Sequence, residues 1–290
     1  YVDAFTVTNR VAKEAHDRML LRLKQGALWW WYTGHANTYS WTSEGLLTKN
    51  DLDEASFKHP PMLLAATCSF LQWDLVNESG AEQLFFNPGG IIGAIAATRP
   101  VYINRNVEMA LAVAKVMSRR NEAGRTLPVG EILRLAKNSI PGNDTNKLRF
   151  VLLGDPALRI AEPCSAIVID SIDGVAPGSD NRPTIKARQK VTVEGHIEAP
   201  HGDIDSDFNG RLYSTLYDAE HSVTTQGHDG SPRITFEQQG DRLNVTNTDV
   251  VGGKFRYTIT MPAEISYNYR SPALSLYALS LIHISEPTRP

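Results

Sequence analysis

The chain has 290 residues, of which 42% are hydrophobic and 21% are charged, and its 29 basic and 32 acidic side chains leave a net charge of −3. This composition is typical of a globular protein with room for two domains, and it excludes collagen, coiled coils and intrinsic disorder. Because there is no long basic run, the charge gives no reason to expect nucleic acid as a partner. No apolar run approaches the roughly 18–20 residues that a membrane-spanning helix needs.

Both ends of the chain carry unusual sequence. The chain starts at Tyr1 without an initiator Met or a signal-peptide pattern, so we expect further sequence upstream. The last twelve residues, 279–290, share no character with what precedes them and resemble one translated reading frame of a common sequencing adapter. We therefore expect an interior fragment in which residues 279–290 are a sequencing-adapter artefact that packs against nothing.

In the first half, helices alternate with buried strands. A helix is predicted over Val11–Lys24, and Gly26 follows its end. Continuous apolar runs predict strands that are covered on both faces, as in a parallel sheet; they span 27–32, 62–67 and 91–97. Further helical periodicity lies at 79–86, 106–120 and 129–138. The order of elements predicts an α/β domain.

The residue pattern of the sequence changes near Glu162–Pro163, and we place a domain boundary there. Beyond it, apolar residues such as Val191 and Val193 alternate with polar ones, and Gly-containing turns such as 251–253 separate the runs. Alternation with one polar face predicts an antiparallel β-sandwich of the immunoglobulin-like type, truncated, over 163–278.

Reactive side chains follow two of the predicted strands. His35 stands three residues after the strand at 27–32, and Cys68 directly follows the strand at 62–67. If these strands are neighbours in a parallel sheet, both side chains emerge at the same edge of the sheet. An imidazole beside a thiol can stabilise the thiolate and later protonate a leaving amine, which is chemistry that cleaves an acyl bond. Cys is also among the most buried residue types, so the spacing alone leaves a structural role open.

Several motifs carry a family resemblance. In the first half stand Tyr-Thr-Gly-His-Ala at 32–36, Leu-Ala-Ala-Thr-Cys-Ser-Phe at 64–70, Asn-Pro-Gly-Gly-Ile-Ile-Gly at 87–93 and Gly-Asp-Pro-Ala-Leu-Arg at 154–159. In this order they resemble the gingipain-type cysteine peptidases, a caspase-like family. In the second half, Asp-Phe-Asn-Gly-Arg-Leu-Tyr at 207–213 and Leu-Tyr-Asp at 216–218 look like the β-sandwich that follows the peptidase domain in sortases of the type IX secretion system. The resemblance covers nearly all of 1–278.

The resemblance implies a fold and an activity. The fold would be the C-terminal part of a caspase-like α/β domain at 1–162, with a mainly parallel sheet and flanking helices, followed by the β-sandwich. The activity would be that of a cysteine endopeptidase or transpeptidase that removes C-terminal sorting domains from secreted cargo through an acyl-enzyme. Such an enzyme would need no cofactor, and it would be secreted or lie at the cell surface in association with the outer membrane. Its partners would be the cargo proteins and outer-membrane secretion components.

The resemblance also implies residue roles. Cys68 would be the nucleophile, His35 the general acid and base, and the backbone N–H groups of Ala36 and Cys68 the oxyanion hole. The family usually has Gly after the catalytic His, whereas this chain has Ala36, which a position with positive φ would strain by about 1 kcal/mol. The acid that orients the His lies upstream in the family, so neither Glu44 nor Asp74 is assigned to that role.

The remaining features have plainer interpretations. Trp41 and Trp73 follow the two reactive residues and are predicted to line the cleft. The acidic run at 203–207 is a polar turn, not a calcium loop, because Phe208 stands where such a loop needs Gly, and no metal site is predicted. Cys164 lies in the linker and is expected to be inert; the two cysteines indicate no disulfide framework, although one bridge between them stays open.

Two alternatives to the sortase hypothesis remain. A secreted gingipain-like protease that only hydrolyses would use the same catalytic pair. A catalytically inactive surface-binding protein could keep the same scaffold; Ala36, in place of the usual Gly, leaves room for that alternative, and the retained His35 and Cys68 argue against it.

Overall fold

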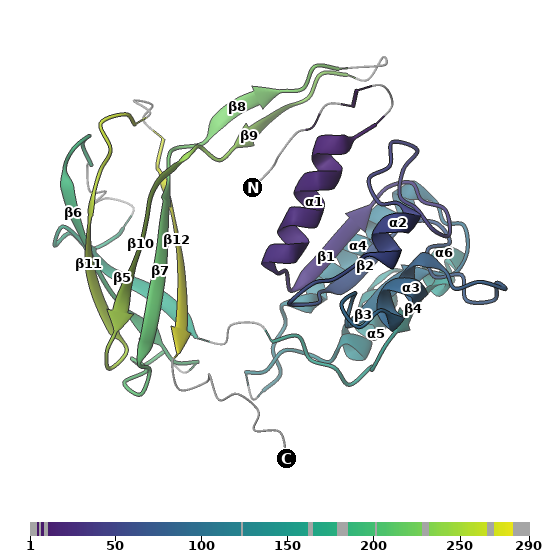
Figure 1. Ribbon diagram of the computed structural model, residues 1–290. Coiled ribbons are helices and arrows are strands. Elements are labelled where there is room, and N and C mark those ends of the chain that lie inside the picture. Colours follow the sequence, from purple (N-terminus) through teal and green to yellow (C-terminus); the bar gives the residue numbers. More distant parts are fainter. Residues whose placement is uncertain are drawn as a thin grey trace. The chain divides into compact units, whose positions relative to one another are not determined.

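The computed structural model describes residues 5, 7–8, 11–122, 124–161, 165–178, 185–200, 202–227, 232–265 and 270–280. The described residues form two compact units, one within Phe5–Glu162 and the other within Pro163–Pro290 (Figure 1). Cys164, which the sequence predicts to be inert, lies outside the described residues.

The first unit is built around a four-stranded sheet. In chain order its elements are α1 (Lys13–Gln25), β1 (Trp29–Thr33), α2 (Lys49–Asp53), β2 (Met62–Ala66), α3 (Gly80–Phe86), β3 (Gly93–Ala97), α4 (Ile103–Met117), α5 (Val129–Ser139), α6 (Thr145–Arg149) and β4 (Phe150–Leu153). The strand order is β1-β2-β3-β4, in which β1, β2 and β3 are parallel and β4 is antiparallel to β3. The α/β prediction is confirmed, with an antiparallel strand added at one edge.

Helices cover both faces of this sheet because the central strands are apolar on both sides. Met62, Leu64 and Ala66 of β2 face a core built with α4 and α5. Leu63 and Ala65 point the other way, into a core that includes residues of α1, α2 and α3. All five residues of β2 are fully buried, as the continuous apolar run predicts.

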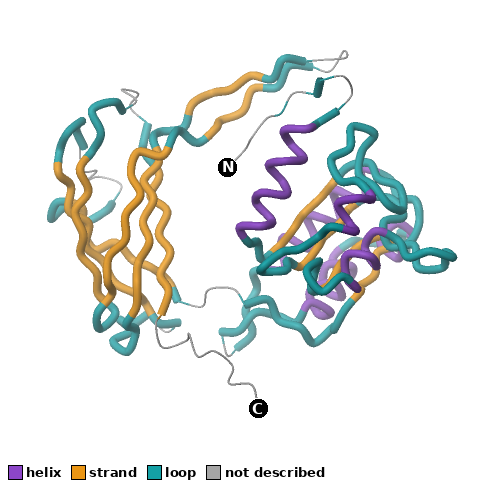
Figure 2. Tube along the Cα trace, in the orientation of Figure 1, coloured by secondary structure: helices purple, strands orange, loops and turns teal. Residues whose placement is uncertain are grey.

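The second unit consists of antiparallel sheets, and Figure 2 shows its described part as strands and loops. Its strands are β5 (Ala166–Ile172), β6 (Lys190–Glu198), β7 (Gly210–Tyr217), β8 (His221–Thr224), β9 (Thr235–Gln238), β10 (Arg242–Val250), β11 (Lys254–Thr260) and β12 (Ala273–Ser280). The sheets have the orders β10-β7-β12, β11-β6-β5 and β8-β9. The two three-stranded sheets share one apolar core, and Ser214 Oγ of β7 lies 2.8 Å from Tyr257 Oη of β11 across it.

The expectation that residues 279–290 pack against nothing is wrong for the first two of them. Leu279 pairs with Arg211 and Ser280 with Gly210, so β12 continues to Ser280. Gly210 leaves room for this pairing, since a Cβ there would lie 2.1 Å from the Leu279 carbonyl oxygen. A β-ladder is made by backbone groups, so it accepts whatever side chains follow in extended conformation. Residues 281–290 lie outside the described residues.

Candidate active site

The two predicted catalytic residues follow β1 and β2, which are neighbouring strands of the sheet. The strands pair in parallel from Trp29↔Met62 to Thr33↔Ala66, and the partners are 33 residues apart in sequence. One residue further along, Thr67 Oγ1 donates a 2.7 Å hydrogen bond to the Gly34 carbonyl oxygen, with the same separation of 33. His35 and Cys68 are the next pair at this separation. Each stands two residues beyond the end of its strand, at the edge of the sheet where the parallel strands β1 and β2 end.

Cys68 is held by the segment that follows β3. Its Sγ lies 3.3 Å from the Val101 carbonyl oxygen, to which it donates, and accepts from the Val101 N–H at 3.4 Å. Ser69, the next residue, has a positive φ of 51°, and its N–H donates to the Arg99 carbonyl at 3.2 Å. The chain thus turns immediately after Cys68, which leaves this side chain partly buried at the strand end.

The backbone of His35 is fixed by a residue of β1 and by a residue of the loop that follows His35. Its carbonyl oxygen accepts hydrogen bonds from Tyr32 Oη at 2.6 Å and from the Thr42 N–H at 2.9 Å. Burial, with a smaller contribution from the negative charge of Glu44, raises the pKa of Tyr32 to about 12, so the phenol stays a donor. A glycine is required at position 34, between Tyr32 and His35, because a Cβ there would lie only 2.5 Å from Tyr32 Oη. The His35 side chain is exposed.

Ala36, which stands where the family usually has Gly, introduces no positive-φ strain in the backbone. Among the described non-glycine residues, positive φ occurs at Thr42, Ser69, Asp173 and Arg188, and Ala36 is not one of them. Within the described part of the chain, neither the Ala36 nor the Cys68 N–H donates to a backbone carbonyl. The assignment of these two N–H groups to an oxyanion hole stays a prediction.

Trp41 does not line a cleft. It is fully buried, stacks on Tyr32 with ring centroids 4.0 Å apart, and contacts Trp30 and Phe70. The prediction from its position after His35 is wrong because the chain folds back there: Trp41 pairs with Ala36 and with Leu47. Trp73, in contrast, is 55% exposed, and its cleft-lining role stays a prediction.

A cavity of about 630 Å³ lies beside His35 and Ala36. Its titratable lining groups in the described chain are His35 and Glu44, and Cys68 is not among the lining residues. The Ser43 hydroxyl, which donates to Glu44 at 2.8 Å, is the main cause that lowers the pKa of this carboxyl, and the charge of His35 adds to it. Asp74 is engaged elsewhere, in a two-point ion pair with Arg99 at 2.8 and 3.1 Å.

A polar network, which the sequence patterns above do not predict, lies next to this cavity. His16 of α1 contacts Asp51 of α2, which also accepts from the backbone N–H and hydroxyl of Thr48. The pattern Thr48-x-x-Asp51 is a helix-capping signal that could have located this helix start. The contact with His16, 35 residues away, has no local signal.

In the described ranges, no group of three or more His, Cys, Asp and Glu side chains could hold a metal ion. No described helix combines the length and apolar character needed to cross a bilayer.

Comparisons with known proteins give the family. The model of peptidase family C25 matches residues 1–161. Latent dimeric PorU from Porphyromonas gingivalis is 20% identical with a TM-score of 0.41, over 91% of this chain and 24% of that one. The Arg-specific cysteine proteinase gingipain R is 14% identical with a TM-score of 0.44, over 84% and 55%. The pro- and mature domains of Porphyromonas gingivalis RgpB are also 14% identical, with a TM-score of 0.46, over 84% and 56%.

This chain spans only part of the length of each of these relatives. The chain spans about a quarter of the length of PorU and just over half that of the gingipain chains. No curated protein sequence matches it. The family model covers more than half of the chain, and the resemblance predicted from the motifs is confirmed by it. The chain therefore belongs to peptidase family C25, a family of cysteine peptidases.

Proposed function

We propose that this chain carries the catalytic His–Cys pair of a cysteine endopeptidase and transpeptidase that removes C-terminal sorting domains from type IX secretion cargo. Residues 1–162 then form the C-terminal part of the caspase-like catalytic domain, and 163–278 form the β-sandwich that follows it. The partners are cargo proteins and outer-membrane secretion components, and the enzyme acts at the cell surface or in association with the outer membrane.

One observation carries the proposal. The separation of 33 residues in the β1–β2 register, continued by the Thr67–Gly34 hydrogen bond, is the separation of His35 and Cys68. Two strand ends with a thiol on one and an imidazole on the other provide the groups that acyl transfer needs. The N–H groups of Ala36 and Cys68 support the assignment of the oxyanion hole, since they are donors placed beside the two reactive residues.

The reaction proceeds in two balanced halves. Cys68 Sγ, as thiolate, attacks the scissile carbonyl carbon, and the two N–H groups bind the oxygen that becomes negative. The C–N bond breaks, protonated His35 gives its proton to the leaving amine, and a thioester on Cys68 remains. An incoming amine or water then loses a proton to His35 as it attacks the thioester, and the Cys68 thiolate is released. An amine yields a new amide, and water yields a carboxylate.

The identity of the acceptor is tested on cargo processed by the full-length protein. The enzyme is incubated with cargo in the presence of increasing concentrations of a small primary amine, and the new cargo C-terminus is determined by mass spectrometry. The sortase proposal predicts amide product that rises with amine concentration, because an acyl-enzyme open to acceptors partitions between them. Free carboxylate alone at every concentration identifies a protease that only hydrolyses. Normal processing by the Cys68→Ala protein would reject both and leave a binding scaffold.

A further inference from the structure

The segment 36–48, called the His35 loop here, leaves the candidate general base and ends at the start of α2. Inside the loop, Trp41 bridges Ala36 and Leu47 in a small ladder. At the His35 end, the Thr42 N–H donates to the His35 carbonyl. The loop also contacts the N-cap of α1, since the N–H of Ala12, the residue before this helix, donates to the Glu44 carbonyl at 2.9 Å. The loop is therefore held by α1 from outside as well as by its own backbone.

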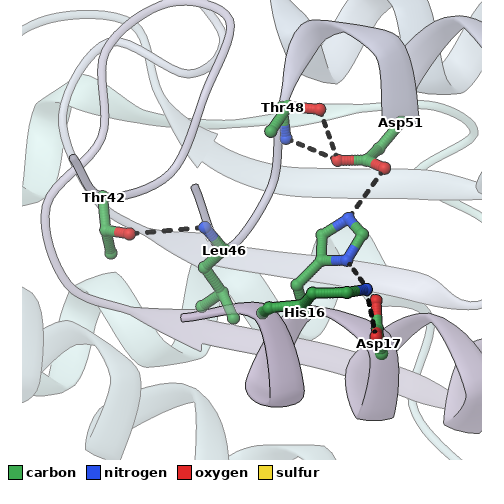
Figure 3. Close-up of polar contacts among 7 residues, drawn as sticks. His16, Asp17, Thr42, Leu46, Thr48 and Asp51 are labelled. Carbon is green, nitrogen blue, oxygen red and sulfur yellow. Dashed lines mark hydrogen bonds and ion pairs between the residues drawn. The ribbon is translucent and has the colours of Figure 1, made fainter. Parts of the chain in front are cut away.

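A side-chain network makes a second connection between α1 and the end of this loop (Figure 3). His16 Nε2 on α1 lies 2.9 Å from Asp51 Oδ1 on α2, and His16 Nδ1 lies 3.0 Å from Asp17 Oδ1. The other oxygen of Asp51 accepts from the Thr48 N–H at 2.7 Å and from Thr48 Oγ1 at 2.6 Å. Asp51 thus joins His16 to the last residue of the His35 loop.

Both ring nitrogens of His16 face a carboxylate, so the doubly protonated ring satisfies both contacts as a donor. The imidazole is about one quarter exposed and the Asp51 carboxyl half as much, which limits screening by water. The other charged groups near His16 are Lys13, which pairs with Asp17 at 2.6 Å, and Glu44, which shares a small cavity with His16 and Asp51. Acidic groups outnumber basic ones around the ring.

The direction of the titration agrees with this geometry. Burial is the largest single influence and lowers the pKa of His16, but the hydrogen bonds and charges of Asp17 and Asp51 together outweigh it and raise the pKa. For Asp51, burial raises the pKa, and the contacts with Thr48 and His16 together lower it. The pair is therefore most stable between the lowered pKa of Asp51 and the raised pKa of His16. Its contribution is lost as the pH rises through the latter.

We propose that His16 is a positioning residue: its imidazolium clamps the His35 loop between α1 and α2 through Asp51 and Thr48, and deprotonation loosens that loop. The clamp is a property of the fold and stands apart from the catalytic proposal. Its effect on acyl transfer, through the backbone contact between Thr42 and His35, rests on the proposed role of His35 as general acid and base. Peptidase activity should then decline on the alkaline side earlier than chemistry at Cys68 alone requires.

The test is residue-resolved amide hydrogen exchange as a function of pH, expressed as protection factors so that the intrinsic pH dependence of exchange cancels. The reporters are the N–H groups of Ala12, Thr42 and Thr48, and the N–H of Ile92, which donates to Pro61 elsewhere in the unit, is the internal reference. Three proteins are compared: wild type, His16→Gln and Lys13→Ala. The Gln amide can keep a neutral hydrogen bond to Asp51 but cannot titrate, and Lys13→Ala removes an exposed ion pair on the same helix.

The proposal predicts that reporter protection in the wild type falls about tenfold as the pH rises through the titration of His16, while Ile92 stays constant. The His16→Gln protein should show a flat profile, and the Lys13→Ala protein should keep a pH-dependent profile because its His16 still titrates. The clamp is overturned if reporter protection in the wild type does not change with pH. It is also overturned if the His16→Gln protein shows the same pH dependence of protection as the wild type. Should His16→Gln fail to fold, the wild type decides: the midpoint of the protection change must coincide with the NMR titration of the His16 ring, and a different midpoint overturns the proposal. This readout needs no peptidase activity, so it is independent of the proposed function.

Discussion

Thr67 Oγ1 donates a 2.7 Å hydrogen bond to the Gly34 carbonyl oxygen, and it joins β2 to β1 immediately before Cys68 and His35. Thr67 is fully buried, so its hydroxyl has no water to bond with if the contact is lost. This side chain therefore links the two strand ends on which the candidate site depends.

Thr67→Val removes that hydroxyl at nearly constant volume. We expect a loss of about 1–2 kcal/mol in the free energy of unfolding and a further loss of cargo processing by the full-length protein. Thr98→Val is the matched control, since Thr98 Oγ1 bonds the Arg149 carbonyl at 3.2 Å beside β4. It should cost similar stability without the loss of processing. Tryptophan fluorescence during urea unfolding measures the stability term, because all five tryptophans lie in the first unit. If the two variants process cargo equally well, the hydrogen bond between Thr67 and Gly34 has no particular role in catalysis.

Gly34→Ala tests the fit between Gly34 and Tyr32. The added methyl group would lie 2.5 Å from Tyr32 Oη and 2.9 Å from Cζ, so the ring that anchors the His35 carbonyl must move. We expect the free energy of unfolding to fall by about 1–3 kcal/mol and processing to fall with it. Gly178→Ala, where an added Cβ meets nothing within 4 Å, is the neutral control. Unchanged stability of Gly34→Ala would show that Tyr32 can shift without cost.

Trp41→Ala tests the corrected role of this residue. Because Trp41 is fully buried against three aromatic rings, we expect a loss of about 3–5 kcal/mol in unfolding free energy. Trp73→Ala, at an exposed position, should leave stability nearly unchanged and raise KM for cargo if it contacts substrate. The opposite pattern, with a stable Trp41→Ala protein altered only in KM, would restore the cleft-lining role.

The end of β12 gives a prediction in the second unit. Truncation after Ala278 removes the ladder pairs of Leu279 and Ser280 with β7, whereas truncation after Ser280 keeps them. We expect the shorter protein to lose about 1–2 kcal/mol relative to the longer one, seen as reduced amide protection at the Gly210 end of β7. Identical protection in the two proteins would mean that these pairs contribute nothing.

The sequence is sufficient to predict β1, β2 and β3 of the first unit's four-stranded sheet, and the reactive residues that follow β1 and β2, but not the strand β4. Few architectures contain a strand that is apolar on both faces, as β2 is, and a parallel sheet covered by helices is one of them. The carboxyl ends of parallel strands lie at one edge of the sheet. The expectation that His35 and Cys68 lie at the same edge follows from these two points. The five-residue helices α2 and α6 are too short to show a period, and the antiparallel direction of β4 is set by tertiary pairing.

The surroundings of the candidate site could not be read in the same way. Trp41 stands close to His35 in sequence, but a stack on Tyr32, formed when the chain folds back, decides its burial. His16 and Asp51 are 35 residues apart, and neither carries a local signal for the other. Contacts of this kind depend on how elements pack, and a periodicity does not encode them.

The central claim, that Cys68 and His35 act as one catalytic pair, is tested most directly by covalent labelling of the full-length protein with a peptide derived from the cargo cleavage site that ends in a thiol-reactive ketone. Mass spectrometry then locates and quantifies the adduct in the wild type, in Cys68→Ala, in His35→Ala and in the exposed-histidine control His59→Ala. The account predicts an adduct on Cys68 in the wild type and in His59→Ala, none in Cys68→Ala, and labelling slower by a factor of at least about 10² in His35→Ala. An adduct on another residue, or labelling of Cys68 at the wild-type rate in His35→Ala, would contradict it.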